Sequence, residues 1–164
     1  MKIGEVQFES PFVLAPLAGV SDSPFRQLAR EQGAAGVTTE MVSSDGLVRG
    51  NQATMDYIAF EPHERPIGIQ LFGSEPRSMA IAAWIAAEGK PDLLDINFGC
   101  PVKKVVNGHA GSALMRDEVH AARILEATAK AVSVPVTLKM RLGWDAKNRN
   151  AARLARIAVA CGIK

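Results

Sequence analysis

Asn97 and Cys100 stand where a short apolar run ends, and their residue types suggest chemistry. They follow LLDI in the stretch LLDINFGCPVKKV, residues 93–105, and Cys100 lies between a glycine and a proline. A structural cysteine packs as a small hydrophobe, whereas glycine and proline indicate a fixed backbone turn. A thiol aimed by such a turn can donate a proton or, once ionised, act as a nucleophile. We therefore interpret Cys100 as functional, with a packing role as the alternative.

Lys139 and Gln70 end two other apolar runs, VTLKM and IGIQLFG. A buried lysine would need a partner, so Lys139 either reaches solvent or points toward an anionic group, and we favour the second. The amides of Gln70 and Asn97 either satisfy nearby backbone groups or bind a ligand. A thiol, an ammonium and two amides suit an electron-rich heterocycle beside a proton donor, as in reduction of a carbon–carbon double bond. Arg26, Arg141, Lys103, Lys104 and His109 are expected to be surface or loop residues, Glu40 a supporting residue, and Cys161 a packing residue.

Short apolar runs alternate with helical patterns along the chain. Such alternation predicts βα units with parallel strand pairing, and the near-continuous apolar strands indicate a sheet covered on both faces. Residues 42–65 are expected to form a short helix and a loop, and a long loop is expected up to residue 115. The predicted strands cover residues 11–15, 35–41, 66–72, 92–97 and 134–140, and the predicted helices cover about 23–33, 74–89, 117–132 and 148–161.

An open doubly wound sheet and an incomplete barrel both fit this order of elements. The turn APLAGVSDSP after the first predicted strand lacks the GxGxxG fingerprint of an open nucleotide-binding sheet. Polar or unusual residues follow nearly every strand, and a barrel gathers these strand ends at one face. We therefore predict a (β/α)8 TIM barrel truncated to about its first five βα units, because 164 residues fall short of the roughly 250 that a barrel needs.

Composition gives broader limits on the class of protein. Apolar residues make up 48% and charged residues 22% of the chain, as in ordinary globular domains, and the net charge is +2. No apolar run is long enough to span a membrane, and the N-terminal residues lack the apolar region of a signal peptide. Two cysteines make neither a disulfide framework nor a metal knuckle. We expect a cytoplasmic protein without a membrane segment or a metal.

Six blocks of sequence follow one another in the order found in a known family. They are LAPLAGVSDSPFR at 14–26, TEM at 39–41, IQLFGS at 69–74, DINFGCPVKKV at 95–105, AGSALM at 110–115 and VPVTLKMRLGW at 134–144. With these blocks the chain resembles the tRNA-dihydrouridine synthases, which are FMN-dependent barrel enzymes, and in particular the bacterial B-type branch. The Asn-x-Gly-Cys-Pro-x-x-Lys element is the most specific of them.

The resemblance implies an activity and a role for each candidate residue. In the family, NADPH reduces FMN, the reduced flavin gives a hydride to C6 of a uracil in tRNA, and an acid protonates C5. Cys100 matches that acid, and Asn97 matches a polar residue that faces the flavin and the target base. The residues that match FMN contacts are Pro16, Leu17 and Ala18 in the first turn, and Gln70 and Lys139 beside the isoalloxazine ring.

The resemblance also implies that residues 1–164 are the N-terminal portion of an FMN-binding barrel domain. The other barrel half, with the FMN phosphate site, and a helical tRNA-binding domain are absent from these residues, and the full-length enzyme is expected to be a monomer. Two alternatives remain. One is another FMN barrel, such as a dihydroorotate dehydrogenase or an ene-reductase of the old-yellow type. The other is an inactive half-barrel that pairs with another chain or only binds RNA.

Overall fold

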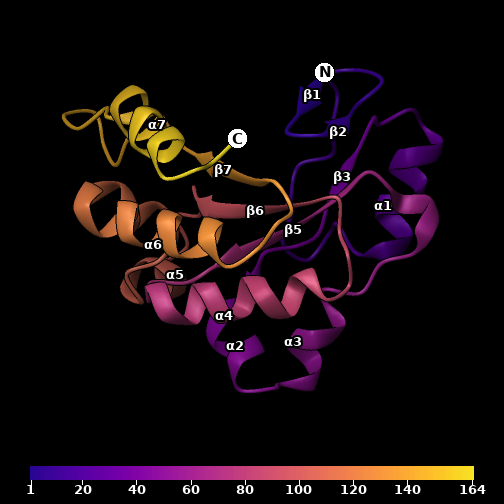
Figure 1. Cartoon of the computed structure of the whole chain (residues 1–164), viewed down its shortest axis with the longest axis horizontal. Helices are drawn as coiled ribbons and strands as arrows, with labels where there is room; N and C mark the ends of the chain where they lie inside the picture. The colour runs from indigo at the N-terminus through magenta and orange to yellow at the C-terminus, as the bar shows by residue number, and fades with distance from the viewer.

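The sheet at the centre of the fold contains only parallel strands (Figure 1). The computed structural model describes residues 1–164. Helices lie in the connections after β5 and β6, as crossovers between parallel strands require. The prediction of an α/β fold with parallel pairing is therefore confirmed in the form of a half-barrel sheet. In sheet order the strands are β3 (Val37–Thr38), β5 (Ile67–Phe72), β6 (Leu93–Phe98) and β7 (Val136–Met140), and β4 (Val42–Ser43) also pairs with β5.

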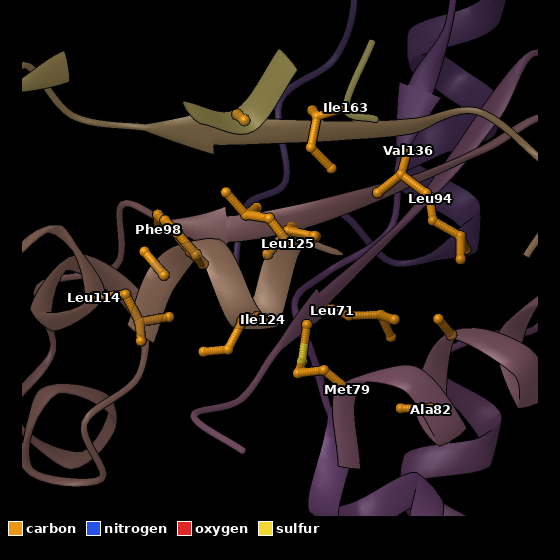
Figure 2. Close-up of a cluster of buried hydrophobic side chains, with 14 of the residues drawn as sticks. Leu71, Met79, Ala82, Leu94, Phe98, Leu114, Ile124, Leu125, Val136 and Ile163 are labelled. Carbon is orange, nitrogen blue, oxygen red and sulfur yellow. The ribbon is translucent and has the colours of Figure 1, made fainter. Parts of the chain in front are cut away.

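One face of the sheet packs against helices α4 (Pro76–Ala87), α6 (Glu118–Lys130) and α7 (Ala151–Ala160). Figure 2 shows Leu94 and Phe98 of β6 on the same side as Ile124 of α6. Burial of a side chain of this size stabilises the fold by about 1.5–3 kcal/mol, so this layer holds the strands in place. Other members of the core are Ile69, Leu71, Met79, Ala82, Ala83, Leu114, Leu125, Val136, Leu154 and Ile163.

The opposite face of the sheet, which we call the inner face, is polar along its central strands. Side chains alternate between the two faces of a strand, so residues paired by register share a face. Gln70 of β5 is aligned with Asp95 of β6. Asp95 and Asn97 are in turn aligned with Thr137 and Lys139 of β7. The inner face therefore brings amides, a carboxylate, a hydroxyl and an ammonium together.

A small hairpin closes the amino-terminal end of the inner face. β1 (Lys2–Ile3) pairs with β2 (Val6–Gln7), and Phe8 then packs against Ala35 and Leu93. Gly36 makes this possible, because a Cβ there would lie 2.5 Å from the Phe8 ring. The hairpin was not predicted, since strands of two residues are too short to show an alternating pattern.

The prediction of a strand at residues 11–15 is wrong in extent. Only Val13 joins the sheet there, through one parallel bridge to Gly36. Prolines occupy positions 11 and 16, and proline has no N–H for a longer ladder. Residues 11–15 therefore run beside β3 as an extended segment.

The strand predicted at 35–41 is limited to β3, and β4 follows it within residues that were expected to form a short helix and a loop. The Thr39 hydroxyl accepts a hydrogen bond from the Gln70 N–H at 3.2 Å and donates to the Glu40 carbonyl at 2.9 Å. A side chain thus replaces a backbone carbonyl as the partner of β5, and the ladder breaks at this point. The segments expected to be mostly loop also contain helices: α2 (Ser44–Val48), α3 (Gln52–Asp56), the 3₁₀ helix η1 (Pro62–Glu64), α5 (Lys103–Asn107) and the 3₁₀ helix η2 (Gly111–Arg116).

The prediction that Arg26 is a surface charge is also wrong. Arg26 lies on α1 (Ser23–Glu31), is 3% exposed, and pairs with Glu64, which is fully buried. Its guanidinium also donates to the carbonyls of Ser21 at 2.9 Å and Ala59 at 3.1 Å. The Ser23 hydroxyl completes the set by donating to Glu64 at 2.6 Å. This network joins α1 to η1, the element just before β5.

Replacing Glu64 with glutamine is expected to lower the free energy of unfolding by about 3 kcal/mol, because the buried guanidinium of Arg26 loses its counter-charge. Urea unfolding followed by circular dichroism measures this change. The matched control is Glu126→Gln, which removes an exposed pair with Lys130 and is expected to cost less than about 1 kcal/mol. Equal losses in the two variants would contradict a structural role for the buried pair.

Candidate active site at the carboxyl ends of the strands

A cavity of about 430 Å³ lies at the carboxyl ends of β5, β6 and β7, within the usual size of a ligand site. Six of the seven predicted site residues line it, and the seventh, Leu17, does not. Leu17 is 42% exposed, and its backbone N–H donates to the Ser21 hydroxyl at 2.9 Å. The lining residues are Pro16, Ala18, Met41, Gln70, Asn97, Gly99, Cys100, Val102, Lys139, Met140 and Arg141.

The loop that carries Pro16 and Ala18 is held by two local contacts. The Ser21 hydroxyl donates back to the Leu17 carbonyl at 3.2 Å, closing a small turn. The Gly19 N–H donates to the Glu40 carboxylate, which anchors the loop to the segment between β3 and β4. Glu40 therefore supports the cavity wall, as the sequence predicted.

Cys100 sits in a turn that Asn97 caps. The Asn97 Oδ1 atom accepts the backbone N–H groups of Gly99 at 3.0 Å and Cys100 at 2.9 Å. The Cys100 carbonyl accepts from Ser112 at 3.0 Å. Gly111 allows this approach, because its φ is +61° and a Cβ there would lie 2.6 Å from the Cys100 carbonyl oxygen. The turn leaves the free, partly exposed thiol at the cavity.

A continuous chain of hydrogen bonds runs behind this turn, along the inner face. Asn97 Nδ2 donates to Gln70 Oε1 at 2.8 Å, and Gln70 Nε2 donates to Asp95 Oδ2 at 2.6 Å. Thr137 Oγ1 donates to Asp95 Oδ1 at 2.6 Å. Gln70, Asp95 and Asn97 are 1%, 8% and 8% exposed, respectively, so these bonds replace those that water would make. We call Asp95, Gln70 and Asn97, with Thr137, the polar relay.

Asp95 is a site residue that sequence reasoning missed. Burial raises the pKa of its carboxyl group above the ordinary value, and hydrogen bonds from Gln70 and Thr137 and the charge of Lys139 offset only part of that rise. The signal was present in the sequence: an acidic residue within the apolar run LLDI must find buried partners. What the sequence could not reveal was that the partners are Gln70 and Thr137.

Two cations border the cavity. Lys139 on β7 is exposed and forms no ion pair within the chain. Arg141, predicted to be an ordinary surface charge, instead lines the cavity and donates from Nε to the Gly99 carbonyl at 2.6 Å. Unpaired positive charge beside amides favours an anionic or electron-rich ligand. Lys103, Lys104 and His109 are exposed, and Cys161 packs against the main core, as predicted.

The side chains do not indicate a metal site or a membrane-spanning helix. No group of three or more His, Cys, Asp or Glu residues is placed to hold a metal ion. Nor does any helix combine the length and apolar character needed to cross a bilayer. The groups that the cavity offers to a ligand are one thiol, two cations and the amides of the relay.

Comparison with known proteins identifies the family of the chain. The family model described as Dihydrouridine synthase (Dus) matches residues 13–164. Relatives include a probable tRNA-dihydrouridine synthase from Rhizobium leguminosarum, 52% identical over 93% of this chain, and one from Rickettsia prowazekii, 46% identical over all of it. A tRNA-dihydrouridine synthase B from Xanthomonas axonopodis is 47% identical over 99%.

The same matches cover 48–50% of the relatives, so the chain spans about half their length. Since the family model covers almost all of the sequence, the chain belongs to the dihydrouridine synthase family.

Proposed function

We propose that residues 1–164 are the N-terminal portion of the catalytic domain of a tRNA-dihydrouridine synthase, which reduces the C5=C6 bond of uridines in tRNA. The observation that carries this proposal is the cavity in which the Cys100 thiol lies with Lys139, Gln70 and Asn97, in a chain of this family. In the complete enzyme, this chain would supply the first five βα units of a (β/α)8 barrel. The remaining units and a helical tRNA-binding domain would complete it.

The lining of the cavity is compatible with the isoalloxazine ring of FMN. Lys139 carries a positive charge that no carboxylate within the chain pairs with, and Gln70 presents an amide whose orientation is fixed by the relay. These two side chains would bind the polar edge of the ring, and the loop of Pro16, Leu17 and Ala18 would lie against it. When bound and reduced by NADPH, FMN supplies the hydride for C6 of the uracil.

Cys100 would supply the matching proton. Hydride addition at C6 leaves negative charge on C5 and the C4 carbonyl, so an acid must be close to C5. The S–H bond of Cys100 breaks as the new C–H bond forms at C5, and the thiolate recovers a proton from solvent. Asn97, which caps the turn, would hold the thiol in place and face the base.

The base has to reach this acid from within a folded RNA. Extrusion of a uridine costs a few kcal/mol of unstacking, and the exposed cations near the cavity would favour the approach of phosphates. The ammonium group of Lys139 would also stabilise negative charge that develops during reduction. Both cysteines are free, which agrees with a reducing, cytoplasmic setting for the enzyme.

Cys100→Ala is expected to abolish dihydrouridine formation while flavin binding and NADPH oxidation persist, because only the proton donor is removed. The test uses a chimaera in which this chain replaces the matching half of the Rhizobium leguminosarum relative. Mass spectrometry of tRNA nucleosides measures the product. The matched control is Cys161→Ala, at the other free cysteine, which should retain activity. Normal product from the Cys100 variant would contradict the assignment of the acid.

Lys139→Met is expected to weaken FMN binding by about tenfold, because a charge-assisted hydrogen bond contributes roughly 1.5–3 kcal/mol. Flavin fluorescence titration of this chain, or flavin content of the purified chimaera, measures the effect. Lys104→Met, at an exposed residue outside the cavity, serves as the control. If the two variants retain flavin equally, the contact between Lys139 and the ring is wrong. A chain and chimaera that both bind no flavin would favour the inactive half-barrel.

A further inference from the structure

The polar relay has a direction, because each side-chain amide has one donor end and one acceptor end. At the turn, two backbone N–H groups, from Gly99 and Cys100, point at the same atom of Asn97. Only Oδ1 can accept them. Nδ2 of Asn97 must then face Gln70, which turns its own Oε1 toward Asn97 and its Nε2 toward Asp95. The turn is capped only if residue 95 offers an acceptor.

The reversed relay fails at the turn. If residue 95 presented a donor, Gln70 would rotate its amide, and its Nε2 would face Nδ2 of Asn97. Asn97 would then rotate in turn and direct Nδ2 at the two backbone N–H groups. Because all three side chains are at most 8% exposed, water cannot easily relieve that conflict, and unsatisfied buried donors are costly.

Thr137 makes this direction independent of the charge on Asp95. When Asp95 is ionised, the Thr137 hydroxyl donates to its Oδ1 at 2.6 Å. When Asp95 is neutral, the proton on Oδ1 can be donated to Thr137 Oγ1, which can donate instead to the Leu94 carbonyl at 3.3 Å. In both states Oδ2 remains free to accept from Gln70. Burial, which raises the pKa of Asp95, therefore leaves the relay intact.

We propose that Asp95, together with Thr137, is a positioning residue for the Cys100 thiol, acting through Gln70 and Asn97 to cap the turn that holds the acid. Asp95 does not line the cavity that holds Cys100, and its link to the thiol runs through the hydrogen bonds of these residues. This inference deepens the proposed function and rests on it for the role of Cys100 as acid. The experiment that tests it needs neither flavin nor tRNA, so the positioning role of Asp95 and the proposed function can fail independently.

A set of near-isosteric variants separates the effect of hydrogen-bond direction in the relay from the effect of side-chain packing. Asp95→Asn keeps the relay, because the new NH2 group can donate to Thr137 while the carbonyl accepts from Gln70. Thr137→Val alone also keeps it. The double variant Asp95→Asn/Thr137→Val removes the Thr137 oxygen from that NH2 group, so that among the relay residues only Gln70 Oε1 can accept from it, and it does so when the relay is reversed. Adding Asn97→Asp restores the cap, since a carboxylate accepts from the turn and from the rotated Gln70.

Site-resolved hydrogen exchange by NMR on this chain measures directly how far the Asn97 cap protects the backbone amides of Gly99 and Cys100. In the double variant the Gly99 and Cys100 amides are expected to exchange about tenfold faster. The internal control is the Leu94 amide, which is bonded to the Pro135 carbonyl, and its exchange rate should change by less than about twofold. A tenfold change corresponds to about 1.4 kcal/mol. Both single variants should exchange like the parent, and the triple variant should return to the parent rate.

Three outcomes would overturn the proposal. The first is parental exchange at Gly99 and Cys100 in the double variant. The second is equal acceleration of the Leu94 control, which would indicate general loosening of the sheet. The third is failure of Asn97→Asp to restore protection in the triple variant, because a purely structural role for Asp95 predicts no such rescue.

Discussion

A buried chain of oriented hydrogen bonds on the inner face of the sheet is the interaction on which the site depends. It begins at the Thr137 hydroxyl and ends at the backbone N–H of Cys100. Parallel register places its members side by side, because β5, β6 and β7 align Gln70 with Asp95 and Asp95 with Thr137. The apolar layer on the other face, which includes Leu94 and Phe98, fixes that register, since a slip of one residue would exchange the two faces.

The same arrangement explains why the two faces of the sheet have different functions. The helix-covered face supplies stability through close packing, whereas the inner face carries polar groups that cost stability unless every one is bonded. The relay satisfies Gln70, Asn97 and Asp95 with one another and with Thr137, and Phe8 packs against Ala35 and Leu93 at the opposite end. The unsatisfied groups are left at the cavity, where the Lys139 ammonium and the Cys100 thiol are available to a ligand.

Sequence alone predicted much of this site because strand ends in a parallel sheet gather at one face. Cys100, Asn97, Gln70 and Lys139 each follow or end an apolar run, so their convergence could be inferred without knowing the register. The pairs that fix the site could not be inferred, because their members are distant in the chain. Asp95 and Thr137 are 42 residues apart, and Arg26 and Glu64 are 38 apart. The two-residue strands β1, β2 and β4 escaped prediction because such short segments carry no periodic pattern, and the strand predicted at 11–15 proved to be a single bridge at Val13.

The central claim is that this half-barrel carries the acid-bearing part of a dihydrouridine synthase site. The most direct measurement is the dihydrouridine content of tRNA incubated with NADPH, FMN and the unsubstituted chimaera that joins this chain to the other half of the Rhizobium leguminosarum relative. The account predicts modified uridines that are heavier by two hydrogen atoms. A chimaera that folds, binds FMN and oxidises NADPH yet leaves every uridine unreduced would contradict it.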